Sequence, residues 1–580
     1  MNFENPLIVQ GNRTLLLDVH APRAEECRNA LIPFAELESS PEHLHTYKLT
    51  ELSLWNYSGA GFKSEDAIAV LNEFSRYDVP QNVTAWIYET ASKFGKIKLV
   101  PGEKIIEKTE DGKEIETEYL YLVCEDILIW KQLASSRLNL TPAKHEGKDA
   151  FLIELVDRGT IKQSLLKLGW PVKDEVPLGE GEPLEVNFRK QTLSGAAFSP
   201  RKYQIESAKA LIGDKGPGTG FGTIVLPCGA GKTIVGMTVM TMLKTSTLVI
   251  TTNISAVHQW ISELLDKTNL TSDQVSEYTG ENKEIKPVTV ATYQVLTWRP
   301  DKNGPYPHFS LFRKRKWGLI IYDEVHMLPA PVFRVTAEIQ AIRRVGLTAT
   351  LVREDGEEGN VFSLVGPKRY DVPWKELETS GFIASAECIE IRLDLSESKE
   401  IEYAVADHRK KHRIASENPG KLQIVQELVR RNPDDKILII GQYIDQLAEI
   451  SKMLSAPIIT GKTPNAERDE IYGKFRSNEI KVLVVSKVAN FAIDLPDASM
   501  AIQVSGTFGS RQEEAQRLGR ILRPKERTSR FFTLITRNTV EEDFGSNRQK
   551  FLAEQGYAYK IIRFSGLSDL DETDAPLRLE

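Results

Sequence analysis

Thr223-Ile-Val-Leu-Pro-Cys-Gly-Ala-Gly-Lys-Thr-Ile-Val-Gly236 is the stretch that decides the fold. Its apolar beginning predicts a buried parallel strand, which Pro227 ends. The loop that follows is built from small residues, which let backbone N–H groups approach a ligand: Cys228, Gly229, Ala230 and Gly231. A helix is then expected to begin at Lys232. This order predicts a phosphate-binding loop in which Lys232 reaches the β- and γ-phosphates and the Thr233 hydroxyl binds Mg²⁺.

The full G-x-x-x-x-G-K-[ST] pattern is not met, because Leu226 stands where its first glycine would be. An ordinary βα turn is therefore an equal alternative for this stretch alone. A second stretch favours the phosphate loop, since an apolar strand ends in Asp323-Glu324-Val325-His326. Asp323 at the strand end can hold Mg²⁺, and Glu324 can orient and deprotonate the attacking water. His326 is predicted to belong to the same catalytic group.

A third stretch runs from Arg511 to Arg523 and carries polar side chains about one helical turn apart. Arg520 and Arg523 are predicted to be arginine fingers, which a second lobe presents across a cleft to the phosphates. A solvated basic helix face is the alternative. Together, the three stretches in this order resemble the superfamily 2 helicases and translocases.

Length and composition narrow the class of protein. A chain of 580 residues is expected to form about three to five domains. No run of 18 apolar residues and no signal peptide is found, so a soluble cytoplasmic protein without a membrane segment is predicted. The four cysteines form no C-x-x-C pair, which argues against a zinc site. The net charge of −7 argues against broad coating of DNA, but not against a motor that grips phosphates through amides and hydroxyls.

Candidate contacts to the nucleotide base and to DNA come from polar residues beside these strands. Gln204, at the start of a predicted helix, can recognise the adenine of ATP, or can be a surface residue of that helix. Hydroxyls and an amide beside predicted strands and in the arginine helix are candidates for contacts with DNA: Thr252, Thr292, Thr348, Thr350 and Gln516.

Leu351-Val-Arg353-Glu354-Asp355 follows Thr-Ala-Thr directly, and the acidic stretch is a DEVH box. In these features the chain resembles the xeroderma pigmentosum group B (XPB) helicase family. The resemblance implies that Arg353, Glu354 and Asp355 form the R-E-D loop implicated in strand separation. It also implies that Asp494, in Ala489-Asn-Phe-Ala-Ile-Asp-Leu-Pro496, lies near the ribose of ATP. Ala492 departs from the glycine of many relatives outside this family.

The predicted fold is α/β, with two RecA-like, doubly wound parallel-sheet lobes, a thumb-like insertion and additional amino-terminal α+β domains. The expected domains are 1–118, an XPB-associated α+β domain; 119–195, a damage-recognition-like domain and linker; 196–355, helicase lobe 1; 356–420, the thumb-like insertion; 421–560, helicase lobe 2; and 561–580, a carboxyl-terminal tail.

The resemblance implies an ATP-dependent DNA helicase or translocase that works in the 3′–5′ direction in DNA repair. Its expected cofactors are ATP and Mg²⁺. Its expected partner is DNA at junctions of single and double strands, with a nuclease or another repair protein as a further candidate. A duplex translocase that distorts DNA and a non-hydrolysing, nucleotide-gated scaffold remain alternatives, and the oligomeric state is left open.

Overall fold

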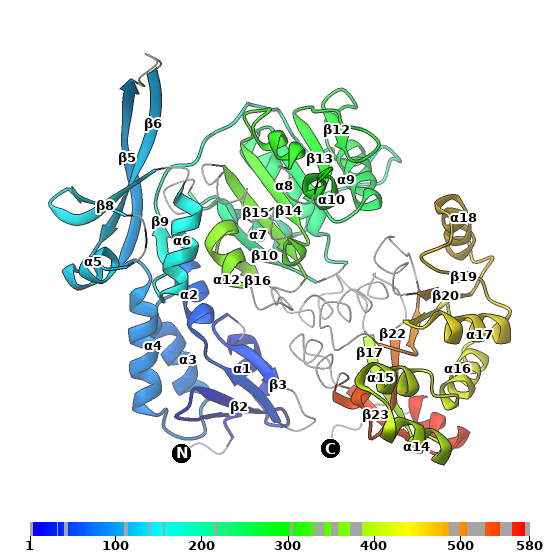
Figure 1. Ribbon diagram of the computed structural model, residues 1–580. Helices are drawn as coiled ribbons and strands as arrows, with labels where there is room; N and C mark the ends of the chain where they lie inside the picture. The colour runs from blue at the N-terminus through cyan, green and yellow to red at the C-terminus, as the bar shows by residue number, and fades with distance from the viewer. Residues whose placement is uncertain are drawn as a thin grey trace.

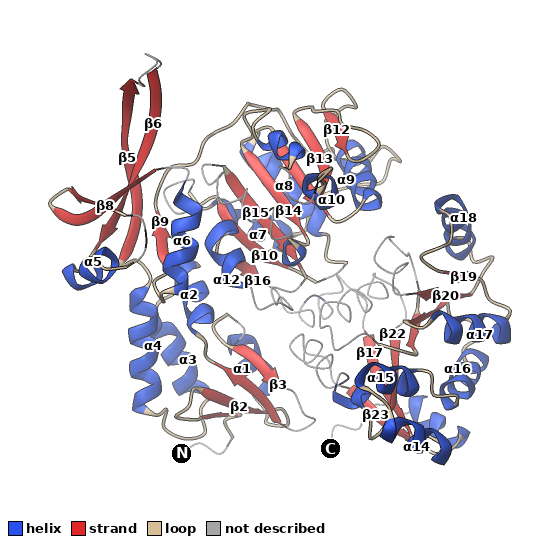
Figure 2. Cartoon of the chain, viewed as in Figure 1, coloured by secondary structure: helices blue, strands red, loops and turns tan. Residues whose placement is uncertain are grey.

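The computed structural model describes residues 4–31, 33–39, 44–108, 114–136, 138, 140–154, 157–214, 219–227, 229–301, 306–328, 332, 342–349, 358–371, 377, 386–486, 498–506, 528–543, 545 and 559–574. Four sheets organise these residues, two of them all-parallel and two amino-terminal to them (Figures 1 and 2). Among the described residues, no helix combines the length and the apolar character needed to cross a bilayer.

The first parallel sheet contains the phosphate-loop strand. Its order is β12 (Val275–Tyr278), β13 (Val288–Thr292), β11 (Thr247–Thr251), β14 (Leu319–Asp323), β15 (Arg343–Thr348), β10 (Phe221–Val225) and β16 (Lys368–Asp371). Its helices are α7 (Lys202–Ile212), α8 (Lys232–Leu243), α9 (Ile254–Lys267), α10 (Tyr293–Thr297) and α12 (Glu358–Asn360), with short turns η2 (Pro307–Phe312), η3 (Val325–Met327) and η4 (Val361–Val365). The central strands are buried along their whole length, as expected for a sheet covered by helices on both faces.

The second parallel sheet has the order β19 (Ile458–Ile459), β20 (Val482–Ser486), β18 (Ile437–Gly441), β21 (Met500–Gln503), β22 (Ser529–Thr536), β17 (Ala386–Leu393) and β23 (Tyr559–Phe564). It is accompanied by α14 (Glu397–Val405), α15 (His408–Ser416), α16 (Gly420–Arg431), α17 (Ile444–Leu454), α18 (Asn465–Arg476) and η5 (Leu567–Asp574). Two parallel α/β lobes are thus confirmed.

The sheets also extend into segments expected to lie outside the lobes. Strand β16 belongs to lobe 1 and β17 to lobe 2, although both fall within the predicted thumb at 356–420. Strand β23 and the turn η5 belong to lobe 2, and Leu570 is completely buried, so described residues beyond 560 are part of a packed structure.

The amino-terminal part has two sheets. One is antiparallel, with the order β1 (Leu7–Val9), β2 (Thr14–Asp18), β4 (Leu44–Lys48) and β3 (Glu36–Ser39), and is accompanied by α1 (Ala24–Leu31), α2 (Glu51–Gly59), α3 (Ser64–Phe74) and α4 (Gln81–Lys93). The other has the order β7 (Thr141–His145), β8 (Lys148–Glu154), β6 (Glu114–Cys124), β5 (Ile97–Lys108) and β9 (Val172–Asp174), with α5 (Ile127–Ala134) and α6 (Arg158–Lys167).

The long antiparallel pair β5–β6 extends away from the rest of the molecule (Figure 1). The predicted domain boundary at residue 118 falls inside β6, because the strand continues along its partners β5 and β8.

Helix α2 joins the amino-terminal part to lobe 1 at the edge strand β16. The backbone N–H of Lys368 donates to Asn56 Oδ1 at 3.0 Å. Arg369 donates through Nη1 to the Gly59 carbonyl at 2.5 Å and through Nε to the Phe221 carbonyl at 3.0 Å. One side chain of β16 therefore holds the end of α2 and the beginning of β10 together.

Candidate active site

The phosphate loop leads from β10 into α8, and its geometry depends on glycine. Gly231 precedes the helix with φ 75° and ψ 48°, in the left-handed region that favours glycine. A Cβ there would lie 2.6 Å from Gln204 Nε2. The helix therefore begins at Lys232, as predicted, with its free N–H groups at the loop.

Helix α7 fixes the same loop from the other side. The Ala230 carbonyl accepts hydrogen bonds from Tyr203 Oη at 2.6 Å and from Gln204 Nε2 at 2.9 Å. Gln204 Oε1 accepts from the Arg201 N–H at 2.8 Å, and the residue is only 4% exposed. The alternative of a surface glutamine is wrong, whereas adenine recognition stays a prediction. Tyr203 belongs to no sequence motif that would mark it for this role.

The acidic stretch lies beside this loop. Asp323 ends β14, and Glu324 follows with φ 50°. Lys232 Nζ lies 3.4 Å from Glu324 Oε1, with both side chains mostly buried. The fold therefore brings together the lysine of the first stretch and the glutamate of the second.

The two adjacent carboxylates are in different electrostatic environments. Burial, and then the negative charge of Glu324, raise the pKa of Asp323 to about 6. Burial also acts to raise the pKa of Glu324, but the positive charge of Lys232 and the neighbouring His326 outweigh it and lower that pKa. Glu324 is thus the stronger acid of the pair and remains a carboxylate at neutral pH.

Trp260 on α9 orients Asp323. Its indole Nε1 donates to Asp323 Oδ2 at 2.8 Å, and Tyr293 Oη donates to the Asp323 carbonyl at 3.0 Å. Trp260 is 1% exposed and packs where Gly236 leaves room on α8, since a Cβ at Gly236 would lie 2.6 Å from the indole. The apolar spacing of α9 predicts burial of Trp260, but it does not reveal this polar partner.

His326 connects the acidic stretch to the next strand. Its Nδ1 lies 2.7 Å from Thr348 Oγ1 and 3.4 Å from Glu324 Oε2. The side chain is 5% exposed. The His326 imidazole therefore connects the Glu324 carboxylate directly to the end of β15.

Comparison with known proteins agrees with this architecture. Residues 377–575 match the family described as ERCC3/RAD25/XPB C-terminal helicase. Residues 7–136 match a helicase conserved C-terminal domain, and residues 197–353 match the type III restriction enzyme, res subunit. The chain is 48% identical over 574 residues to the DNA 3′-5′ helicase XPB of Kineococcus radiotolerans, covering 98% of each chain. The chain belongs to the XPB helicase family.

Other XPB relatives are similar over nearly the whole chain. The DNA 3′-5′ helicase XPB of Mycobacterium tuberculosis is 45% identical, over 97% of this chain and 98% of the relative. The general transcription and DNA repair factor IIH helicase/translocase subunit XPB of Antonospora locustae is 32% identical, over 98% and 83%.

In this XPB-family chain, oxygen atoms suited to Mg²⁺ lie around the phosphate loop. The half-buried Thr233 hydroxyl forms no hydrogen bond with another described residue. The Asp323 carboxylate accepts hydrogen bonds from the Glu324 N–H and the Trp260 indole, and it retains further lone pairs for an ion. Hydroxyl and carboxylate oxygens are the ligands that Mg²⁺ prefers, so the residues present fit the ion. Among the described residues, no group of three His, Cys, Asp or Glu side chains could hold a metal.

The predicted DNA-contacting hydroxyls differ in exposure. Thr252 is half-buried and accepts from Asn253 Nδ2 at 3.2 Å. Thr292 is 3% exposed and accepts from the Val295 N–H at 3.2 Å, which caps α10. Thr348 has no exposed surface, and its hydroxyl is hydrogen-bonded to His326. Because the side chain is buried, the structure does not support its predicted contact with DNA.

A pocket of about 660 Å³ opens where β11 and β13 end and α9 and α10 begin. Thr292, Gln294 and Lys283 line it, together with Trp298, whose side chain is 54% exposed. Trp298 could not be recognised from the sequence, because a tryptophan after a short helix has no distinguishing pattern.

Several predicted site residues lie outside the described residues, and nothing in the structure bears on them: Cys228, Thr350, Arg353, Glu354, Asp355, Asp494, Gln516, Arg520 and Arg523.

Proposed function

We propose that this protein is an ATP-dependent DNA helicase of 3′–5′ polarity that acts in DNA repair. The observation that supports this most strongly is the contact of Lys232 with Glu324, which joins a phosphate loop to a candidate base. Membership of the XPB family supports the DNA substrate and the polarity, since the bacterial relatives carry the name DNA 3′-5′ helicase XPB.

The geometry suggests how ATP enters the site. Lys232 is the cation that the β- and γ-phosphates attract, yet it lies against Glu324. Arriving phosphates would replace Glu324 as the partner of Lys232, which frees the glutamate to orient water. The ATP site would therefore activate its own base only when it is filled.

Thr233 and Asp323 would hold Mg²⁺ beside the phosphates. The ion would neutralise charge on the phosphate oxygens during transfer. Glu324, no longer paired with Lys232, would accept a hydrogen bond from the attacking water. On the opposite lobe, Arg520 and Arg523 are proposed to approach the γ-phosphate, with Asp494 near the ribose.

DNA would contact lobe 1 at the ends of the parallel strands. Thr252 and the pocket beside Thr292 lie at the same edge of the sheet as Asp323. Trp298 adds an exposed aromatic surface on which a base can stack, a contact that contributes about 1–3 kcal/mol per base.

Phosphate release with and without DNA, followed by strand displacement on forked substrates, tests the proposal. Wild type is expected to show DNA-stimulated hydrolysis, and Lys232→Ala is expected to abolish it, because the charge that holds the phosphates is lost. Stimulated hydrolysis that survived Lys232→Ala would refute the proposed site.

A duplex translocase that distorts DNA is a second candidate. The eukaryotic relatives carry the description helicase/translocase, which keeps it open. Strand displacement on forked and blunt substrates, with wild type and Arg353→Ala, separates the two. An Arg353→Ala variant that hydrolyses ATP with DNA but no longer separates strands supports the helicase.

A further inference from the structure

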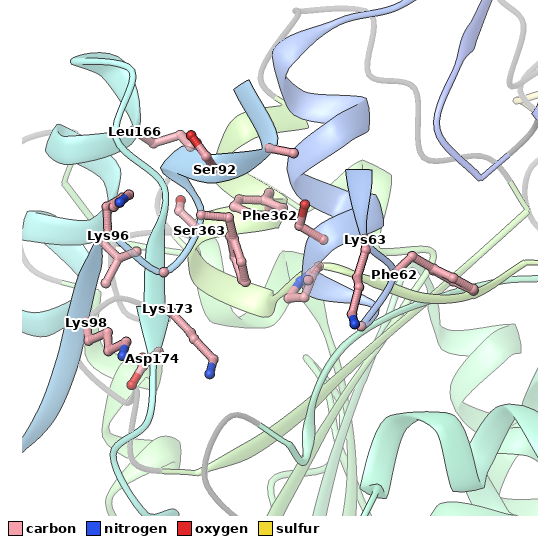
Figure 3. A pocket seen from close by; sticks show the side chains of 18 of the residues that line it. Phe62, Lys63, Ser92, Lys96, Lys98, Leu166, Lys173, Asp174, Phe362 and Ser363 are labelled. Carbon is pink, nitrogen blue, oxygen red and sulfur yellow. The ribbon is translucent and has the colours of Figure 1, made fainter. Parts of the chain in front are cut away.

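A pocket of about 710 Å³ lies between the amino-terminal domains and lobe 1. Its walls come from the α2–α3 turn, the α4–β5 turn, strand β9 and the helix α6, and from lobe 1 at the beginning of β10 and at Pro367 and Arg369. Figure 3 shows Lys63 and Lys173 on opposite sides of this space. Ligand pockets in proteins have volumes of about 300–1,000 Å³, and this pocket lies within that range.

The lining of this pocket is rich in positive charge. The basic side chains come from six positions in separate elements: Lys63, Lys96, Lys98, Lys162, Lys173 and Arg369. The acidic ones are Glu65, Glu125 and Asp174. In a chain with a net charge of −7, this concentration of cations is local and creates a positive field in a concave space.

Basic residues already engage two of the three acids. Glu125 lies 2.9 Å from Lys98 and 3.1 Å from Lys148. Asp174 is buried and lies 2.7 Å from Arg158 and 2.9 Å from Lys162. These carboxylates therefore offset the charge of their own partners. Lys173 pairs with Glu175 at 2.7 Å, so Lys63 and Lys96 are the lining lysines whose charge no carboxylate of the described residues offsets.

The floor of the pocket carries cations around one aromatic ring. The buried Lys162 and the half-buried Arg369 line the pocket and lie 5.7 and 5.5 Å from the Phe221 ring centroid. Arg344, which is fully buried and does not line the pocket, lies 5.3 Å from the same centroid. Burial, followed by the charges of Arg344 and Arg158, lowers the pKa of Lys162 to about 8. An anion above this floor would be attracted by charges that the fold holds in place.

The rim supplies adaptable groups. Lys63 and Lys96 are exposed, and neither ammonium forms an ion pair with another residue of the described ranges. A lysine of this kind binds phosphate as a flexible point charge.

We propose that this pocket is a second anion site, which takes the phosphate groups of a nucleotide unit, supplied either by a free nucleotide or by a DNA strand. This site is separate from the proposed ATP site: Phe221 lies at the beginning of β10, whereas the phosphate loop follows the opposite end of that strand. The site therefore binds phosphate without taking part in hydrolysis.

The test uses the full-length chain with the exposed pair changed to Lys63→Glu/Lys96→Glu. A control pair of equal charge change, Lys131→Glu/Lys452→Glu, lies on exposed positions of α5 and α17 outside the pocket. Binding of labelled oligothymidylate is measured against salt concentration, and binding of ADP is measured by calorimetry. Thermal unfolding and hydrolysis without DNA check that each variant is folded.

If a DNA strand is the source, the Kd for oligothymidylate rises about tenfold in the pocket pair only, and the salt slope falls by roughly 0.7 per lost phosphate contact. If a free nucleotide is the source, the pocket pair loses one ADP-binding site per chain and keeps the site at Lys232.

If neither measurement differs from the control pair, the proposal is overturned, even where wild type hydrolyses ATP with DNA. If the glutamate pair fails to fold, the milder Lys63→Gln/Lys96→Gln pair replaces it. The same binding measurements then test the proposal.

Discussion

Asp323 and Glu324 are adjacent in the chain, yet their pKa values move in opposite directions. The difference arises from position: Lys232 contacts Glu324 and lowers its pKa, whereas burial and the negative charge of Glu324 raise the pKa of Asp323. Pairs of titratable groups pushed apart in this way are typical of sites that need one metal ligand and one base.

Trp260→Phe tests the role of the indole. Trp260 lowers the pKa of Asp323, so its loss raises a pKa that is already about 6. Protons compete with metal for a carboxylate, and lowering the pH from 8 to 6 protonates more of Asp323. We expect the Mg²⁺ concentration for half-maximal ATPase to rise in the variant, several-fold more at pH 6 than at pH 8.

Trp55→Phe is the matched control, because Trp55 donates its indole N–H to the Thr90 carbonyl, far along the chain from the site. A Mg²⁺ requirement that shifts equally at both pH values in Trp260→Phe would contradict the role assigned to the indole.

At this scale the sequence predicted which residues lie together but not the supporting contacts. The proximity of Lys232 to Glu324 could be predicted, because a phosphate loop and an acidic strand end meet at the same edge of a parallel sheet. Tyr203 and Trp260 could not be, since their polar atoms meet partners that only the folded chain brings near. Predictions from hydroxyl type alone were weakest, as the buried Thr348 shows.

Helix α8 packs against α9 at Gly236, a position that no sequence motif marks as important for packing. Gly236→Ala places a Cβ 2.6 Å from the Trp260 ring. We expect a loss of about 1–3 kcal/mol in unfolding free energy from this overpacking, with reduced ATPase because Trp260 is displaced. Urea unfolding and ATPase assays measure both.

Gly473→Ala gives the opposite expectation on α18. A Cβ there meets nothing within 4 Å, so the higher helix propensity of alanine should stabilise lobe 2 by about 0.5–1 kcal/mol. Equal effects of the two substitutions would show that packing against Trp260 is not the cause.

One helix begins inside a stretch whose apolar alternation alone favours a strand. Strand β4 ends at Lys48 and α2 begins at Glu51. Thr50 caps that helix by accepting from the Ser53 N–H at 3.0 Å, while Ser53 Oγ accepts from the Thr50 N–H. The reciprocal cap stabilises a helix in spite of the apolar alternation. The Thr-x-x-Ser pattern is the sequence feature that indicates this helix start.

For the whole molecule, the two lobes could be predicted because parallel strands buried on both faces appear as continuous apolar runs. The attachment of the amino-terminal part to β16 could not, since it depends on backbone atoms of Gly59 and Lys368 that any sequence would carry.

The proposed cooperation of the lobes gives a prediction at this scale. Arg523→Ala should leave ATP binding nearly intact, because Lys232 and the loop amides remain. It should reduce hydrolysis by about 10³–10⁵, the range for a supplied arginine. Binding of a labelled ATP analogue and single-turnover hydrolysis measure the two effects, and a parallel loss of both would refute a finger role.

Arg369, which grips the carbonyls of Gly59 and Phe221 at once, has a mechanical consequence. The same side chain binds strand β10, which leads into the phosphate loop, and helix α2 of the amino-terminal part. We therefore expect the domain that contains α2 to move together with lobe 1 in any rearrangement of the two lobes.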